Sequence, residues 1–286
     1  MIYKVVLFLS ISMIFFGCSP KDILLGDSQV YDSTKNYSYN FSQHSFKTDD
    51  KTTLDAIYIK TTKKSKGLIV VVNGMMENMS LRFTKWLWIV DSGYDVFTFD
   101  YRGYGDSKAE ADLAGFRDDV ASALKYAHSL DEDRKIILVG QSMGGTYVID
   151  ALSLENYDYV SLAVIDSTFT GFASNLSSLM MKTVVLFPLS WTPYTFSPSE
   201  YNAIKNVEHV KTPLLFVSGD SDFITGSSNS KALYEKATTQ KAIWIVEDAG
   251  HVEGFNNKDV RSAFLDLIGH MGELKLAQKK YFDKSL

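Results

Sequence analysis

Ser142 is the residue whose type and setting most clearly suggest chemistry. It is the centre of Gly140-Gln141-Ser142-Met143-Gly144, which ends a short apolar run and precedes apolar residues at helical spacing. A G-x-S-x-G sequence between a strand and a helix holds the serine on a tight turn with its hydroxyl exposed. Glycine is expected at 140 and 144 because side chains there would collide where strand and helix cross. The motif therefore predicts that Ser142 is a nucleophile.

A serine hydroxyl needs a base, and neutral histidine oriented by a carboxylate is the usual solution. His251 directly follows the last apolar strand, and two aspartates, Asp220 and Asp222, lie in the loop after the strand before it. Functional loops of a parallel sheet lie at the carboxyl ends of its strands. The order Ser142, Asp222, His251 is the order expected after such a turn. The other histidines are predicted to be solvated on strand edges or helices: His44, His128, His209 and His270.

The elements that would position these residues alternate between strand and helix. Continuous apolar runs predict strands that are buried on both faces, and the alternation predicts an α/β fold with a mostly parallel central sheet flanked by helices on both faces. A hairpin at Ser45–Thr48 and Leu54–Thr61 precedes them. Further strands are expected at Leu68–Val72, Tyr94–Phe99, Lys135–Val139, Tyr159–Ile165, Pro213–Ser218 and Ala242–Val246, and helices at Leu81–Asp91, Asp112–Leu130, from Met143, at Ser227–Ala237 and at Asp259–Met271.

Composition excludes several classes of protein. The chain has 286 residues, 45% hydrophobic and 22% charged, which is ordinary for a globular protein with a sizeable core. Its net charge of -5 and the absence of a basic run argue against a nucleic-acid partner. Cys18 is the only cysteine and the histidines show no metal-ligand spacing, so neither a disulfide framework nor a metal site is expected.

Residues 1–18 have the pattern of a targeting segment. Lys4 precedes an apolar stretch that is too short to span a bilayer comfortably, and the stretch ends in Gly17-Cys18. This resembles the bacterial lipoprotein signal, in which Cys18 would become the lipidated first residue. The alternatives are an uncleaved anchor or a secretory signal with an incidental cysteine. The resemblance implies a membrane-anchored lipoprotein of the bacterial cell envelope, on the extracytoplasmic side.

Residues 19–43 are rich in Ser, Asp, Asn and Tyr and are predicted to be a tether. Their aromatic residues are either a recognition strip or, as we favour, side chains packed on the flank of the adjoining domain: Tyr31, Tyr37, Tyr39 and Phe41.

Between Ser45 and Met271 the chain resembles the α/β-hydrolase superfamily, and within it Bem46-like and related esterase- or peptidase-like serine hydrolases. The motifs that carry the resemblance are Asn73-Gly74, Asp100-Tyr101-Arg102-Gly103-Tyr104-Gly105-Asp106-Ser107, the serine turn, Gly219-Asp220-Ser221-Asp222 and Gly250-His251. The resemblance implies an α/β-hydrolase domain at 44–272, followed by a tail at 273–286. It also implies a short helical cap insertion at about 168–210. An apolar cap would shape an acyl pocket, and the alternative is a small helix pair packed on the sheet.

The resemblance also assigns roles within the site. Counting from Gly219, Asp222 matches the acid of the family's G-x-x-D arrangement, with Asp220 and Asp166 as the rivals. The backbone N–H groups of Met143 and Met75 would form the oxyanion hole. Two residues depart from the family's pattern: Asn73, where histidine is usual, and Thr225, where proline is common.

Four further side chains could each have one of two roles. Arg102 is either a substrate clamp or, as we favour, a structural arginine that braces the turn near Asp106. Met75, Met76 and Met79 either line an acyl pocket or fill the core.

Together these residues predict a serine hydrolase that cleaves a carboxylic ester through an acyl-enzyme on Ser142, without a cofactor. The substrate would be a small or lipid-like acyl compound. A peptidase or thioesterase would use the same triad, and a non-catalytic lipoprotein that keeps the scaffold for binding is the competing class. Serine at position 142 excludes an aspartate nucleophile.

Overall fold

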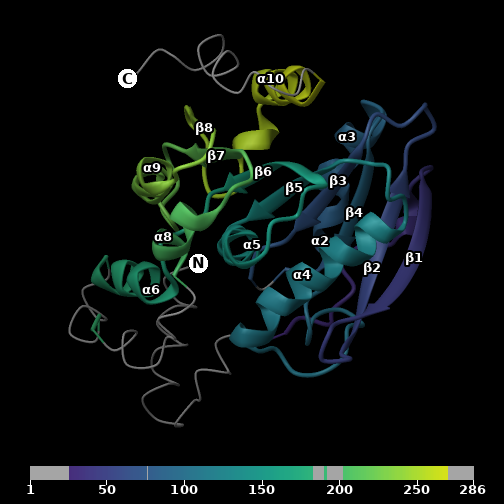
Figure 1. The fold of residues 1–286 in the computed structure, drawn as a ribbon, viewed down its shortest axis with the longest axis horizontal. Coiled ribbons are helices and arrows are strands. Elements are labelled where there is room, and N and C mark those ends of the chain that lie inside the picture. The colour runs from purple at the N-terminus through teal and green to yellow at the C-terminus, as the bar shows by residue number, and fades with distance from the viewer. Residues whose placement is uncertain (1–25, 76, 183–189, 192–201, 270–286) are drawn as a thin grey trace.

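A mixed sheet of eight strands forms the centre of the computed structural model, which describes residues 26–75, 77–182, 190–191 and 202–269 (Figure 1). The strands lie in the order β1-β2-β4-β3-β5-β6-β7-β8. β1 and β2 form an antiparallel hairpin, β2 also pairs antiparallel with β4, and the remaining pairs are parallel. The strands are β1 (Asn40–Lys47), β2 (Thr53–Lys60), β3 (Leu68–Val72), β4 (Asp95–Phe99), β5 (Ile136–Gln141), β6 (Val160–Asp166), β7 (Leu214–Gly219) and β8 (Lys241–Val246). The predicted α/β-hydrolase fold is confirmed.

Helices cover both faces of this sheet, as the continuous apolar strands require. One buried cluster joins the sheet to α4 (Leu113–Ser129), α5 (Met143–Leu154) and α9 (Ser227–Lys236). A second cluster on the other face joins it to the helices after β3 and to α10 (Lys258–Gly269). The central strands β3 and β4 are buried along their whole length, which explains their β-branched and aromatic composition.

The edge hairpin begins earlier than its sequence indicates. β1 starts at Asn40, within the predicted tether, and pairs with β2 from Asn40 opposite Lys60 to Lys47 opposite Thr53. Most of its residues are polar because this edge strand has few buried positions. Tyr37, Tyr39 and Phe41 pack against the second cluster, and the rings of Tyr37 and Phe41 each lie 5.5 Å from that of Phe83. The packing interpretation therefore holds for these three residues.

The helix expected at Leu81–Asp91 is three short elements instead. They are α2 (Met79–Arg82), η3 (Phe83–Trp86) and α3 (Leu87–Asp91). Asn78 caps the first of them by accepting a hydrogen bond from the backbone of Ser80, which moves its start two residues earlier than Leu81. Phe83 and Trp86 are both buried, and their spacing of three residues suits the tighter 3₁₀ turn that aligns them.

The predicted cap segment is described in part. α6 (Phe172–Met181) lies within it, and after this helix Lys182 donates a hydrogen bond to the carbonyl oxygen of Phe223 at 3.0 Å. α8 (Ala203–Asn206) and the turn Val207–His209 bury Ala203 and Val207 in the first cluster. The aromatic stretch between these elements, apart from residues 190–191, lies outside the described residues, as do the predicted signal segment and the C-terminal tail. Within the described residues no helix is both long and apolar enough to cross a membrane.

Candidate active site

Ser142 stands on a strained turn between β5 and α5. Its backbone has φ 52° and ψ -120°, a conformation that residues with side chains rarely adopt. A Cβ atom at Gly144 would lie 2.4 Å from the carbonyl oxygen of Val72, and one at Gly140 would lie 2.7 Å from the Cα of Gly145. Both contacts are with backbone, which cannot move aside. The two glycines are therefore required where the strand, the helix and the loop after β3 meet.

His251 lies between Ser142 and Asp222 in a continuous chain of hydrogen bonds. The Nε2 atom of His251 is 3.0 Å from the hydroxyl oxygen of Ser142, and its Nδ1 atom is 3.0 Å from Oδ2 of Asp222. With the proton on Nδ1, the ring donates to the carboxylate and Nε2 is free to accept the serine proton. The Asp222 side chain is fully buried, whereas the His251 side chain is 19% exposed. The three residues come from loops after β5, β7 and β8, at one edge of the sheet.

The Asp222 carboxylate is held in place by several donors. Its Oδ1 atom accepts hydrogen bonds from the backbone N–H groups of Ile224 at 2.9 Å and Thr225 at 3.0 Å. Burial raises the pKa of Asp222, but the hydrogen bonds from His251 and Thr225 outweigh this effect and hold the pKa well below its usual range. Asp222 is therefore a carboxylate at neutral pH.

Thr225 contributes more to the site than the sequence suggested. Its hydroxyl lies 2.6 Å from Oδ2 of Asp222 and 3.1 Å from the carbonyl oxygen of Ser167. The side chain is buried, at 5% exposure. Proline at this position would lack both this hydroxyl and the N–H that Asp222 accepts. The departure from the family's proline was the only signal in the sequence that pointed to Thr225.

Neither rival carboxylate hydrogen-bonds to His251. Asp220 is exposed and accepts a hydrogen bond from the backbone of Asp248, which fastens the β7 and β8 loops together. Asp166 is fully buried and accepts hydrogen bonds from Gln141 at 2.9 Å and Ser167 at 3.1 Å. Burial raises the pKa of Asp166 to about 6, and the hydrogen bonds from Gln141 and Ser167 oppose the rise. Of the three aspartates, only Asp222 makes that contact.

The two residues predicted to supply the oxyanion hole follow β5 and β3. Met143 is the first residue of α5, so its N–H has no partner within the helix. Met75 follows Gly74, where a Cβ atom would come within 3.2 Å of the Cβ of Ser142. The loop after β3 therefore passes directly beside the nucleophile.

Asn73 turns away from that loop into the sheet. Its side-chain NH₂ group donates a hydrogen bond to Thr98 on β4 at 3.1 Å, and its backbone carbonyl oxygen accepts one from the Tyr101 hydroxyl at 3.2 Å. Asn73 thus orders the loop by fastening its base to β4.

Of the methionines near this loop, Met79 is 8% exposed and belongs to the second buried cluster. Met75 is partly buried and packs against the first buried cluster, which contains α4, α5 and α9. Met76 lies outside the described residues.

Arg102 has a structural role, but it pairs with other carboxylates than that of Asp106, near which it was expected to act. Its guanidinium lies 2.7 Å from Asp119 on α4 and 2.8 Å from Asp50 in the hairpin turn, and it does not pair with Asp106. Burial lowers the pKa of Arg102, but the two carboxylates more than compensate and raise it. A side chain at Gly115 would collide with the guanidinium, at 2.3 Å from its nearest atoms. Arg102 therefore connects the loop after β4 to α4 and to the β1–β2 turn, and its guanidinium is occupied by these contacts.

Two histidines that were expected to be solvated are half-buried. His44 lies 2.9 Å from the hydroxyl of Tyr126, and His128 stacks on Tyr159 with ring centroids 3.8 Å apart. His209 is exposed as predicted, and His270 lies outside the described residues. In the part of the chain that the structure describes, no group of three or more potential ligands is arranged to hold a metal ion.

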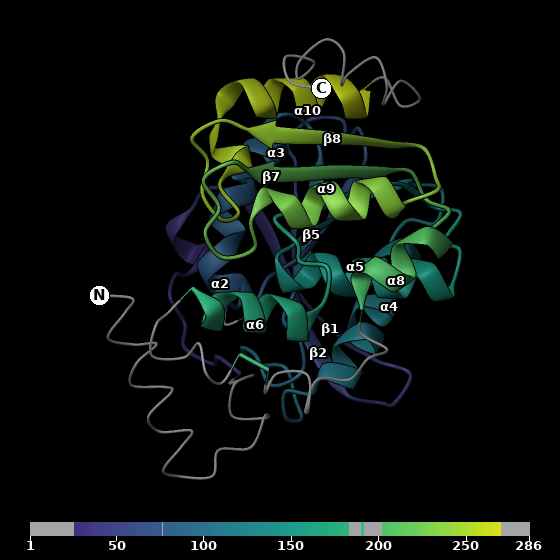
Figure 2. The same cartoon turned by 90° about the vertical axis from the view of Figure 1, so that its left-hand side faces the viewer.

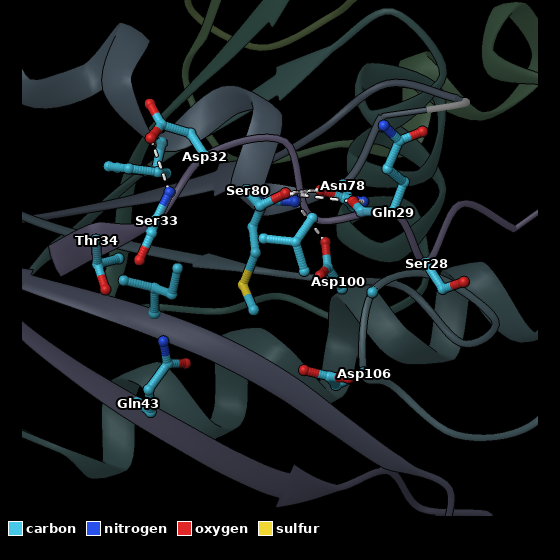
Figure 3. A pocket seen from close by; sticks show the side chains of 15 residues that line it. Ser28, Gln29, Asp32, Ser33, Thr34, Gln43, Asn78, Ser80, Asp100 and Asp106 are labelled. Atoms are coloured by element: carbon cyan, nitrogen blue, oxygen red, sulfur yellow. Dashed lines mark hydrogen bonds between the residues drawn. The ribbon is translucent and has the colours of Figure 1, made fainter. Parts of the chain in front are cut away.

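Apart from this site, a cavity of about 190 Å³ lies against residues 26–34, which we call the strap (Figure 3). The strap is fastened to α2 and to the loop after β4. Asp100 faces the cavity, and its Oδ1 atom accepts a hydrogen bond from the backbone of Met79 at 2.6 Å. The pKa of Asp100 is raised to about 7, mainly by burial, with the Met79 hydrogen bond opposing the rise and the neighbouring charges of Asp55, Asp106 and Asp27 adding to it.

Stability should therefore fall as pH rises through the range in which Asp100 ionises. The folded protein keeps a proton up to about pH 7 that the unfolded chain releases near pH 4, so this group costs about 1.4 kcal/mol per pH unit between those values. Replacing Asp100 by asparagine should make the unfolding free energy decline less steeply between pH 5 and pH 7, as measured by urea unfolding. Asp133→Asn, the same change at an exposed aspartate in the loop before β5, should keep the wild-type slope. Equal slopes for Asp100→Asn and wild type would contradict this account.

Part of the chain is similar to a hydrolase family, and most of it is similar to two curated proteins. Residues 63–200 match a family described as serine aminopeptidase, S33. The YfhR protein of Escherichia coli K12 is 29% identical over 205 residues, which cover 70% of this chain and 69% of YfhR. The protein Bem46 of Schizosaccharomyces pombe is 28% identical over 210 residues, covering 72% and 68%.

Solved structures share the fold at lower identity. The Pyrococcus furiosus esterase Pf2001 matches with a TM-score of 0.69 and 18% identity, over 90% of this chain and 98% of the esterase. Acetyl xylan esterase 1 from Thermoanaerobacterium matches with a TM-score of 0.62 and 19% identity, over 84% and 87%.

Proposed function

We propose that this chain, which belongs to the α/β-hydrolase superfamily and is similar to Bem46 and YfhR, is a serine hydrolase that cleaves carboxylic esters. The observation that carries the proposal is the pair of 3.0 Å contacts that link Ser142, His251 and Asp222. Unrelated folds use the same arrangement of side chains to activate serine, so the geometry indicates nucleophilic catalysis independently of the family.

Acylation would begin with attack of the Ser142 oxygen on the ester carbonyl carbon. His251 takes the serine proton on Nε2, and Asp222 stabilises the resulting imidazolium ion. The carbonyl oxygen becomes an oxyanion, which the N–H groups of Met143 and Met75 would bind. When the intermediate collapses, the bond to the alkoxy oxygen breaks and His251 returns the proton to the departing alcohol. An ester of Ser142 remains.

Deacylation would repeat these steps with water. His251 removes a proton from a water molecule, whose oxygen attacks the acyl carbon and forms a second oxyanion. The bond to the Ser142 oxygen then breaks, and the proton on His251 passes to the serine. The products are a carboxylic acid and the free enzyme, so neither a metal nor an organic cofactor is needed for the balance.

An ester is favoured over a peptide because two of the similar solved structures are esterases, which match over 90% and 84% of this chain. The family name serine aminopeptidase keeps peptide amides as the alternative, and a thioester would need no change in the residues. Initial rates with p-nitrophenyl esters of increasing acyl length, an aminopeptidase substrate and an acyl thioester would decide among them.

A fluorophosphonate probe tests the proposal most directly, because it reacts covalently with an activated serine. The wild type should be labelled, and mass mapping should place the adduct on Ser142. Ser142→Ala should not react. Ser221→Ala is the matched control, since Ser221 is an exposed serine on the Asp222 loop, and this variant should label as the wild type does. An unlabelled wild type would favour the non-catalytic binding protein instead.

A further inference from the structure

Most of the large apolar side chains on the described surface gather at the edge of the sheet that carries the active site. Val30, Tyr31 and Leu81 lie on the side of β3 and β4, and Met181, Phe223 and Ile224 lie on the side of β6 and β7. β5, which ends at Gln141 directly before Ser142, lies between the two groups in the sheet order. Figure 2 shows α2 and α6 together near this edge, toward which the arrowhead of β8 points.

The exposure of these side chains is costly in water. Phe223 is 81% exposed and Val30 is 73% exposed, although each is large and apolar. Exposed apolar groups that cluster around one site usually mark a surface that is covered in use. Trp191, Leu130 and Leu154 are also exposed, and the two leucines lie at the C-terminal ends of α4 and α5, and therefore at the opposite edge of the sheet.

The strap brings the N-terminal part of the chain to this same edge. Asn78 donates hydrogen bonds to the carbonyl oxygens of Asp27 at 3.0 Å and Gln29 at 2.7 Å. The N–H of Gly105, in the loop after β4, donates to the same oxygen of Asp27 at 2.8 Å. The N–H of Tyr31 donates to Ser80 at 3.0 Å, and Figure 3 shows Gln29, Asn78 and Ser80 side by side at the cavity. Residue 26 is therefore fixed beside the loops that follow β3 and β4.

The length of chain that precedes residue 26 limits how the domain can face a membrane. Cys18, the predicted lipidation site, is eight residues before Gly26, and that segment reaches at most about 28 Å when fully extended. A domain of this size has a diameter on the order of 45 Å. If the edge with Leu130 and Leu154 faced the membrane, residue 26 would lie roughly 45 Å away, beyond the reach of the segment.

We propose that the active-site edge rests on a lipid bilayer, held there by lipid on Cys18 and by the apolar side chains on both sides of Ser142. The aromatic side chains Tyr31 and Phe223 suit the boundary between headgroups and acyl chains. An acyl anchor gains in strength from a second membrane contact, which this edge supplies. The inference does not depend on the chemistry at Ser142, and its test needs no activity.

The test uses the processed chain with lipid on Cys18 in phosphatidylcholine vesicles, which are zwitterionic and so do not repel an acidic protein. Cys18 is the only natural cysteine and would be blocked by lipid, so one introduced cysteine carries a fluorophore alone. Leu81→Cys and Leu130→Cys form a matched pair, because both leucines are 39% exposed. Phe223→Cys and Leu154→Cys form a second pair, at 81% and 69%.

Lipids with brominated acyl chains should quench the fluorophore at 81 and 223 at least threefold more than at 130 and 154. Equal quenching within the pairs, or none at 81 and 223, would overturn the proposal. If the fluorophore emission at 81 and 223 instead shifts to the blue with rising protein concentration and is not quenched by the lipids, a second copy of the chain covers this edge and the proposal is overturned. The proposal would also be overturned if the intact mass of the protein in the membrane fraction showed that Cys18 carries no lipid.

Discussion

Replacing Ser142 by alanine is expected to lower kcat for an ester by about 10⁶, because the nucleophile and its base act as one unit. The remaining rate would come from the N–H groups of Met143 and Met75 and from substrate binding. Steady-state rates with p-nitrophenyl acetate measure the loss. A residual rate within tenfold of the wild type would show that another residue is the nucleophile.

The backbone of Ser142 predicts a second effect with the opposite sign. Alanine at φ 52° keeps the strain, whereas glycine adopts this conformation freely. Ser142→Gly should therefore be inactive and yet raise the unfolding free energy by about 1 kcal/mol over Ser142→Ala. Ala109→Gly, at φ 67° on an exposed loop, is the control and should gain stability without losing activity. A less stable Ser142→Gly would show that the turn is not strained.

Much of the sheet could be predicted from the sequence, because burial on both faces leaves a readable pattern. Leu68–Val72 is the clearest case, since it is both the predicted and the observed strand. The start of β1 at Asn40 could not be read in this way, because an edge strand is stabilised by backbone pairing that polar side chains do not reveal. The break of the helix after β3 also depends on tertiary packing, in which Phe83 and Trp86 both enter the core.

The sequence predicted which loops meet at the site, because the order of the parallel strands determines this. Loops at the carboxyl ends of parallel strands converge, so Ser142, Asp222 and His251 were expected together, and they lie within hydrogen-bonding distance. Asp222 was chosen over Asp220 only through the family's G-x-x-D arrangement, and in the structure Asp222 is the one of the two that contacts His251. The partners of Arg102 also needed it, since Asp50 and Asp119 are distant in sequence.

Asp222→Asn is expected to lower kcat by about 10⁴ while leaving the fold intact. Asparagine can still accept the hydrogen bonds from Ile224 and Thr225 on its carbonyl oxygen. Its NH₂ group would then face His251 and donate to Nδ1. The histidine proton would move to Nε2, which could no longer accept the proton of Ser142. The loss therefore arises from the wrong tautomer, and rates with a soluble ester should measure it.

Asp220→Asn is the matched control, because it makes the same change two residues away on the same loop. Its remaining oxygen can still accept the hydrogen bond from Asp248, so its rate should stay within about twofold of the wild type. Near-normal turnover in Asp222→Asn would move the acid role to Asp166, which is buried beneath the site with a pKa raised to about 6 by desolvation. In that case Asp166→Asn, and not Asp222→Asn, would show the large loss. The ratio of the two losses thus identifies the carboxylate that orients His251.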